Sequence, residues 1–337
     1  MTQNPLADQT TPAEFGTLAD GRKVEAVTLT GGGLRARVLT LGATVQDLRL
    51  DGVPHPLVLG CETPDAYLGP GLYLGAIVGR FANRIGGAGF LLDGRAHVLD
   101  ANFLGRHMLH GGSEGTHSQI WRIEALEASS VTLSLSLPDG HMGFPGRLDI
   151  VARIALADRT LRIALEARTD KATPCSLTHH GYFDLDGLGS IRDHRLRIAA
   201  QHYLPVDAEM IPDGRMLPVA GTPFDFRADR PVGQAGALDH NFCLSDGPVP
   251  MRPVAWLTGR SGLTLEVQTD CCGLQVYDGA HFDGMAGLQG RRYGPHAGIA
   301  FEAQHWPDAP NRPGFPDAIL RPGEIWRSCT EYCLTQA

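Results

Sequence analysis

Glu302 is the residue of this sequence whose position most plainly suits proton transfer. It follows directly after the apolar run Ile299–Phe301, which predicts a short strand, and it precedes a proline-rich loop. A carboxylate at the end of an apolar strand loses hydration, so its pKa rises unless a cation or hydrogen-bond donors hold the charge. Such a group is a usable general base. The alternative is a surface glutamate at a strand end, and this stretch alone does not decide between the two.

Two histidine-containing segments are the next candidates. In Met108–Gly112, the glycines allow a ligand to approach the backbone closely beside His110. In Leu177–Leu185, His179 and His180 adjoin an aromatic pair, which suits a sugar site, a metal site or a strand end with structural histidines. Because neighbouring side chains of a strand point to opposite faces, His179 and His180 are poorly placed to ligate one ion.

Metal chemistry and nucleophilic chemistry find less support in the motifs. The 14 histidines include no H-E-x-x-H or H-x-H motif, and the cysteines include no C-x-x-C pair, so we expect no metal ion. Gly111–Gly115 matches G-x-S-x-G, but that motif marks a nucleophile only between a strand and a helix of an α/β fold. Asn83-Arg84 and Asp239 each suit a turn as well as a binding site.

Charge and composition narrow the class of partner. A net charge of −8 over 337 residues argues against a nucleic-acid partner and favours a neutral substrate over an anionic one. The seven cysteines are odd in number, and Cys271 and Cys272 are adjacent, so we expect free thiols in a reducing compartment, the cytoplasm. Residues 1–16 lack the pattern of a signal peptide, and no apolar run approaches 18 residues, so we expect no membrane span.

The elements that must position these side chains are predicted to be strands. Apolar and polar residues alternate with a period of two, and the pair Asp93-Gly94 marks a hairpin turn. The alternating stretches are residues 34–38, 131–137, 148–156, 161–167 and 263–267. Helical periodicity is scarce and no β-α-β alternation occurs. We therefore predict an all-β protein, one large antiparallel β-sandwich over residues 13–337 after a loose tail at 1–12, with the site in its long loops.

Six segments, taken in order, resemble the aldose 1-epimerase (galactose mutarotase) family. They are Asn83–Ile85, Leu109–Gly112, Thr178–Phe183, Asp239–Phe242, Leu274–Tyr277 and Glu302–Ala309. Each is weak alone, but six in family order, from about residue 15 to the end, are specific. The resemblance implies a galactose mutarotase-like supersandwich without a cofactor. It also implies an isomerase of carbohydrate and hexose metabolism that interconverts the α and β anomers of a free monosaccharide, as a monomer or homodimer.

Carried over by position, the resemblance assigns roles to eight residues. Glu302 corresponds to the general base, His180 to the general acid, and His110 to a second donor to the ring oxygen or a hydroxyl. The sugar-binding positions are Asn83, Arg84, Tyr182, Asp239 and Gln275. Two departures from the family pattern bear on the pocket. Thr178-His179-His180 stands where Thr-Asn-His is usual, and Tyr277–Ala280 reads Tyr-Asp-Gly-Ala where Tyr-Thr-Gly-Asn is common.

Three other function classes remain open from the sequence. A non-catalytic carbohydrate-binding module would need no acid–base pair, and a phosphosugar epimerase of the same superfamily should carry extra arginine or lysine in the pocket loops. A glycoside hydrolase would need two carboxylates facing one glycosidic bond, for which Asp239 or Asp308 would have to join Glu302.

Overall fold

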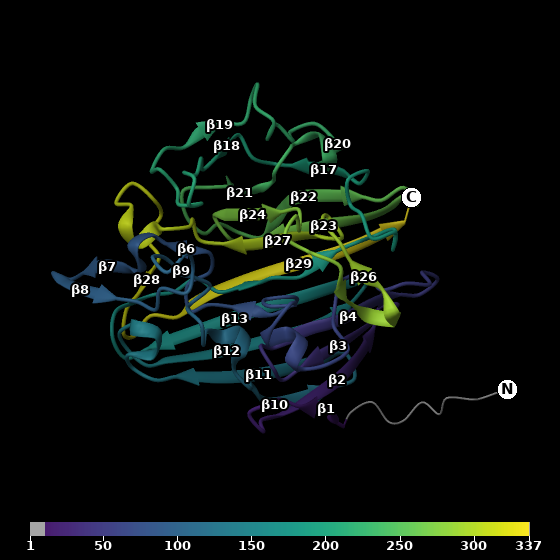
Figure 1. Ribbon diagram of the computed structural model, residues 1–337, viewed down its shortest axis with the longest axis horizontal. Helices are drawn as coiled ribbons and strands as arrows, with labels where there is room; N and C mark the ends of the chain where they lie inside the picture. The colour runs from purple at the N-terminus through teal and green to yellow at the C-terminus, as the bar shows by residue number, and fades with distance from the viewer. Residues whose placement is uncertain (1–10, 337) are drawn as a thin grey trace.

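The structure is a computed structural model that describes residues 11–336 (Figure 1). Three sheets hold most of its strands, and all neighbouring strands in them are antiparallel. Most of the predicted tail, residues 1–10, lies outside the described part, and the first strand begins at Ala13. Within residues 11–336 the helices are short 3-10 turns, as the scarce helical periodicity predicted. None of them has the length and apolar character needed to cross a membrane.

The largest sheet has nine strands, and the two others have four and six. In spatial order the nine are β10 (Arg122–Glu127), β11 (Ser130–Leu137), β12 (Leu148–Ala157), β13 (Thr160–Thr169), β29 (Trp326–Gln336), β23 (Leu263–Thr269), β22 (Arg252–Thr258), β17 (Arg195–Ile198) and β20 (Arg230–Pro231). The four are β1 (Ala13–Thr17), β2 (Lys23–Gly31), β3 (Leu34–Leu39) and β4 (Thr44–Leu50). The six are β16 (Tyr182–Phe183), β27 (Ile299–Gln304), β24 (Gly273–Tyr277), β21 (Asp239–Cys243), β18 (His202–Tyr203) and β19 (Leu217–Pro218).

Short strand pairs and 3-10 turns connect the sheets. The pairs are β14 (Thr173–Pro174) with β28 (Ile319–Leu320), β15 (Thr178–His179) with β5 (Ile77–Val78), β25 (Met285–Ala286) with β26 (Arg292–Tyr293), β6 (Arg84–Ile85) with β9 (Met108–Leu109), and β7 (Gly89–Leu92) with β8 (Arg95–Val98). The turns are η1 (Asp65–Leu68), η2 (Gly86–Ala88), η3 (Thr116–Ser118), η4 (His141–Gly143), η5 (Val232–Gln234), η6 (Leu288–Gly290) and η7 (Ala309–Asn311).

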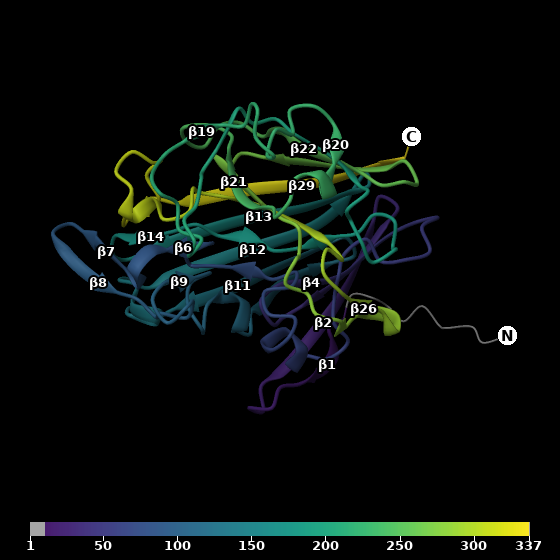
Figure 2. The same ribbon diagram turned by 45° about the horizontal axis from the view of Figure 1, so that its top comes forward.

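Side-chain alternation builds the core as the sequence predicted. Along β12 the residues Leu148, Ile150, Ala152, Ile154 and Leu156 are buried, and those between them are more exposed. The turn predicted at Asp93-Gly94 joins β7 and β8. One apolar cluster takes residues from all three sheets, so the large sheet packs against the two others (Figures 1 and 2). This shared core is what joins the sheets into the predicted β-sandwich.

The strands β21, β24 and β27 have one face on this core and the other toward loops. On β27, Ile299, Phe301 and Ala303 belong to the core cluster, whereas Glu302 lies on the opposite face. Because side chains alternate along a strand, the apolar run that buries β27 also fixes the direction in which Glu302 points. The core therefore orients the candidate base.

The tight turn at residues 110–112 depends on glycine. His110 has φ +50, and Gly111 and Gly112 follow with φ +86 and +99, values that favour glycine. A Cβ on Gly111 would lie 1.9 Å from the carbonyl oxygen of Gly79. This close approach packs the segment of His110 against the segment that leads to Arg84.

We expect Gly111→Ala to lower the free energy of unfolding by about 2 kcal/mol or more, because the methyl group meets rigid backbone in a strained conformation. Denaturant unfolding followed by fluorescence measures it. Gly314→Ala is the control, since no atom of residues 11–336 lies within 4 Å of a Cβ there, and it should stay within about 0.5 kcal/mol of wild type. Equal midpoints for the two variants would contradict the role given to this turn.

Candidate active site

Strand register gathers several polar residues on one face of the six-stranded sheet. Glu302 lies opposite Gln275, and Gln275 opposite Asn241, across β27, β24 and β21. Asp239 and Tyr277 face each other one step along the same two strands. Because cross-strand partners share a face, Glu302, Gln275, Asp239 and Tyr277 all emerge on the side away from the core.

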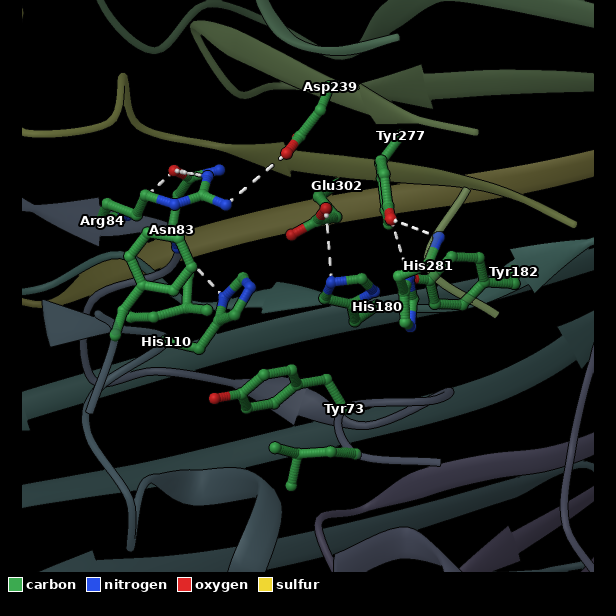
Figure 3. A pocket seen from close by; sticks show the side chains of 13 residues that line it. Tyr73, Asn83, Arg84, His110, His180, Tyr182, Asp239, Tyr277, His281 and Glu302 are labelled. Atoms are coloured by element: carbon green, nitrogen blue, oxygen red, sulfur yellow. Dashed lines mark hydrogen bonds and ion pairs between the residues drawn. The ribbon is translucent and has the colours of Figure 1, made fainter. Parts of the chain in front are cut away.

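Loops from the rest of the chain close over this face. The pairing of β6 with β9 places Arg84 opposite Leu109, next to His110. The pairing of β15 with β5 delivers His180 directly after β15. The resulting cavity of about 340 Å³ is lined by Leu72, Tyr73, Asn83, Arg84, Phe103, Leu109, His110, His180, Tyr182, Asp239, Tyr277, His281 and Glu302 (Figure 3).

Glu302 and His180 form the centre of the cavity. The Nε2 atom of His180 lies 3.5 Å from Oε1 of Glu302, and their side chains are only 5% and 2% exposed. Burial, with a smaller contribution from Asp239, raises the pKa of Glu302 well above its ordinary value, while Arg84 acts in the opposite sense. Burial lowers the pKa of His180 to about 3. These opposite shifts favour an arrangement in which the pair shares one proton, since burial disfavours both the doubly charged and the anionic arrangement.

His110 is held as a neutral hydrogen-bond donor. Its Nδ1 accepts the backbone N–H of Asn83 at 3.1 Å, so in the neutral ring the proton lies on Nε2. Burial and the neighbouring His180 lower its pKa well below the ordinary value. One ligand atom each of His110, His180 and Glu302 lie within 4.8 Å of one another, a spacing that a metal ion could use. A histidine that accepts on one nitrogen and carries its proton on the other offers no free lone pair, so the tautomer of His110 opposes metal ligation.

Arg84 is fixed by three partners around its guanidinium. Its Nη2 lies 3.5 Å from Oδ2 of Asp239, the Asn83 carboxamide oxygen accepts from its backbone and side chain, and the ring of Phe103 lies 4.6 Å below it. The Asn83 side chain thus supports Arg84. A fixed guanidinium beside a carboxylate offers donors and an acceptor together, which suits a pair of neighbouring hydroxyl groups.

Seven of the eight residues that the sequence singled out line this cavity, and Gln275 is the exception. Its Nε2 donates to Oδ1 of Asp239, so Gln275 orients Asp239 and lies beside the cavity on the same face of the sheet as Glu302. His179 points the other way, as strand alternation predicted. It is buried, with its Nδ1 3.2 Å from the Tyr332 hydroxyl.

Tyr73, Phe103 and His281 were not among the predicted residues. The Tyr73 ring lies 4.6 Å from the rings of both His110 and His117 and 6.1 Å from that of His180, so it packs against the two imidazoles of the candidate site, His110 and His180. It adopts φ +70 within a glycine-rich segment, Gly69–Gly75, that carries no periodic signal. The sequence signal for these positions is limited to their aromatic side chains.

Comparison with known proteins points to one family over nearly the whole chain. The sequence model of the family described as aldose 1-epimerase matches residues 25–333. The galactose mutarotase of Homo sapiens is 38% identical over 333 residues, which cover 95% of this chain and 97% of that protein. The aldose 1-epimerase of Escherichia coli (strain K12) is 36% identical over 334 residues, covering 93% and 96%.

Solved structures agree with the sequence comparison. The aldose epimerase homologue from C. elegans superposes with a TM-score of 0.88 at 28% identity, covering 93% of this chain and 99% of that one. The galactose 1-epimerase from Lactobacillus acidophilus NCFM superposes with a TM-score of 0.84 at 30% identity, covering 97% and 98%. The fold and the sequence therefore indicate the same relatives.

The opposite directions of His179 and His180 generate a prediction for the anomer interconversion that the resemblance implies. His180→Gln should lower kcat by at least about 10²-fold, because it removes the only transferable proton at that position. His179→Asn should leave kcat nearly unchanged and lower the unfolding free energy by about 1–3 kcal/mol, because it disturbs a buried hydrogen bond to Tyr332. Polarimetric rates and denaturant unfolding measure the two effects, and the reverse ranking of the rates would contradict the assignment.

Proposed function

The chain belongs to the aldose 1-epimerase family and is an isomerase of aldose anomers, and from this premise we propose how its residues perform the reaction. Glu302 acts as the general base on the C1 hydroxyl, and His180 as the general acid on the ring oxygen. The contact of 3.5 Å between these two side chains in a buried cavity carries the proposal. The two reacting oxygens of a hemiacetal share one carbon, so an acid and a base in contact can reach both.

The reaction balances with these two groups alone. Glu302 takes the proton of the C1 hydroxyl, the carbonyl forms at C1, and the C1–O5 bond breaks with its electron pair on O5. His180 gives its proton to O5. The aldehyde end then rotates about the C1–C2 bond, and the ring closes on the other face with both proton transfers reversed. Positioned acid–base groups contribute roughly 10²–10⁴-fold each, which suits a reaction that is already facile in water.

The pair keeps one proton throughout. Before ring opening His180 is a protonated imidazolium and Glu302 a carboxylate. Afterwards Glu302 is a neutral carboxylic acid and His180 a neutral imidazole, so the pair carries the same number of protons in both states. Burial favours the second arrangement, as the raised pKa of Glu302 and the lowered pKa of His180 imply. Arg84 favours the first, because its charge lowers the pKa of Glu302. The balance between burial and Arg84 lets the same pair run the reaction in both directions.

The other lining residues have binding roles in this proposal. The His110 ring contacts the His180 ring edge to face, with centroids 5.1 Å apart. Its Nε2–H is therefore available to a sugar oxygen near His180. Arg84 and Asp239 bind hydroxyl groups on carbons other than C1, which leaves C1 free to rotate about the C1–C2 bond. Tyr182 packs beside His180, with ring centroids 5.1 Å apart.

Specific features weaken the alternative functions. A binding module would not require a buried carboxyl–imidazole pair. A phosphosugar epimerase should present several cations, yet Arg84 is the one arginine or lysine among the described residues that line the cavity, and Asp239 pairs with it. A hydrolase would require a second working carboxylate, but Arg84 and Gln275 engage Asp239, and Asp308 lies outside the lining.

We further propose a cytoplasmic location, because all seven cysteines are unpaired thiols and six of them are buried. A small monosaccharide remains the proposed partner, and a monomer or homodimer the proposed assembly.

Polarimetry tests the function and the base together. Freshly dissolved α-D-glucose, α-D-galactose, D-xylose and L-arabinose should reach anomeric equilibrium faster with the protein than without it. Glu302→Gln keeps the shape and removes the basicity, so kcat should fall by at least about 10²-fold while sugar binding changes much less.

Asp308→Asn is the matched control in the same loop. The Asp308 carboxylate accepts the Gly86 N–H at 2.9 Å and the Arg312 Nε–H at 2.7 Å, so its replacement should cost stability before rate. If Glu302→Gln works at the wild-type rate while Asp308→Asn is inactive, Glu302 is not the base.

The shared proton predicts the pH dependence of kcat/KM. The one-proton state is lost on the acid side only as pH falls toward the His180 pKa of about 3, and on the alkaline side as pH rises through the raised pKa of Glu302. The profile should therefore be flat on the acid side of neutrality and fall as the pH rises through the raised pKa of Glu302. Stopped-flow polarimetry in constant ionic strength measures it, and a fall between pH 7 and 5 would contradict the shared proton. The alkaline limb should be absent in Glu302→Gln.

A further inference from the structure

Tyr277 and His281 form a hydrogen-bonded pair at one end of the cavity. Figure 3 shows Asn83, Arg84 and His110 on one side of Glu302 and His180, and Tyr182, Tyr277 and His281 on the other. The Nδ1 atom of His281 lies 2.7 Å from the Tyr277 hydroxyl, and the two rings stack at 5.4 Å with an angle of 15°. His281 is exposed at the rim and Tyr277 is partly buried, so this end of the cavity is open.

A braced turn holds the pair in place. It begins at Asp278, directly after β24, and returns the chain so that His281 covers Tyr277. The buried Asp278 carboxylate accepts the Ala280 N–H at 3.2 Å and lies 3.2 Å from Nδ1 of His296. Gly279 has φ +66, and a Cβ there would lie 2.6 Å from the carbonyl oxygen of Gly298. Asp278 therefore acts on the rim through the shape of this turn.

The Tyr277–His281 pair offers a ligand one hydrogen-bond acceptor. The Tyr277 hydroxyl accepts the backbone N–H of His281 at 3.0 Å. Above the ordinary histidine pKa of about 6.5 the His281 ring is neutral, and its Nδ1 can accept a hydrogen bond from the Tyr277 hydroxyl. One lone pair of the Tyr277 oxygen remains. The pair thus presents a fixed acceptor, flanked by aromatic carbon, in the part of the cavity wall that Tyr277 and His281 line.

The proposed chemistry indicates which part of a sugar meets this acceptor. When O1 contacts Glu302 and O5 contacts His180, C2 extends to one side of the reacting bond and C5 to the other. Arg84 and Asp239 offer paired charges that suit the neighbouring hydroxyls on C2 and C3. The substituent on C5 then extends toward Tyr182, Tyr277 and His281. In aldohexoses that substituent is a hydroxymethyl group, an apolar CH₂ with one donor, which matches aromatic carbon beside one acceptor.

We propose that Tyr277, oriented by His281, binds the hydroxymethyl group on C5 of aldohexoses and so makes the enzyme favour hexoses over pentoses. This inference rests on the proposed roles of Glu302 and His180. It also fits the reaction, since an anchor at C6 stays in place while the C1 end rotates. Tyr277 is a specificity residue here, and His281 and Asp278 are positioning residues.

The test compares sugars that differ only at C5. D-galactose carries hydroxymethyl there, D-fucose carries methyl, and L-arabinose carries hydrogen, with C2–C4 alike in all three. At pH 8, Tyr277→Phe should lower kcat/KM for D-galactose by roughly 2- to 12-fold, the worth of one neutral hydrogen bond. The loss should lie in KM, because the contact is the same before and after ring opening. D-fucose and L-arabinose should be unaffected.

Tyr73→Phe is the matched control, because Tyr73 lines another wall and its hydroxyl accepts a long hydrogen bond of 3.5 Å from Asn102. It should change the rates for D-galactose and D-fucose by the same factor. The inference is overturned if Tyr277→Phe affects both sugars equally, or if Tyr73→Phe alone changes their ratio. If the wild-type protein accelerates none of the three mutarotations, the proposed function itself fails, which separates the two outcomes.

Discussion

A buried carboxyl group and a buried imidazole that share one proton are the constraint on which this structure depends. Neither Glu302 nor His180 can hold its charge comfortably alone, because each is almost wholly removed from water. A lone carboxylate would be neutralised by protonation, and a lone imidazolium would lose its proton. Placed 3.5 Å apart, the two groups can pass a proton to and from a bound sugar without exposing an isolated charge.

The fold meets this constraint by packing irregular loops against one face of a regular sheet. Regular strands supply Glu302, Asp239 and Tyr277 in fixed register, with the core on the reverse face of the same sheet. Irregular loops supply His110 and Asn83 at positive φ, where local backbone energy is unfavourable and neighbouring contacts must compensate. The strands fix direction, and the loops fix distance and exclude water. Arg84 links the loops to the sheet, since it lies in the short strand pair β6–β9 and contacts Asp239 of the six-stranded sheet.

The sequence predicted what local patterns encode, and it missed what depends on packing between distant segments. Period-two alternation identified β12 and β13, and strand alternation separated His179 from His180, because both follow from local geometry. The position of Gln275 beside Asp239 could not be predicted, since it depends on the register of β21 against β24, which brings together two residues 36 positions apart. Tyr73 and His281 were missed because nothing in their neighbourhoods is periodic. Their roles arise only when loops meet over the sheet.

The two departures from the family pattern show why position on the sheet decides what a residue can change. His179 adds an ionisable group next to the candidate acid in sequence, yet alternation sends it into the core, where burial lowers its pKa to about 3 and keeps it neutral. It therefore adds no charge near His180. Asp278 is also buried, but its carboxylate shapes the turn that places His281 over Tyr277. A change on the core side of a strand is thus silent for the chemistry, whereas one at the strand end reshapes the rim. In the proposed mechanism, acid–base chemistry and sugar preference therefore depend on different segments of this fold, and either could change while the other stayed intact.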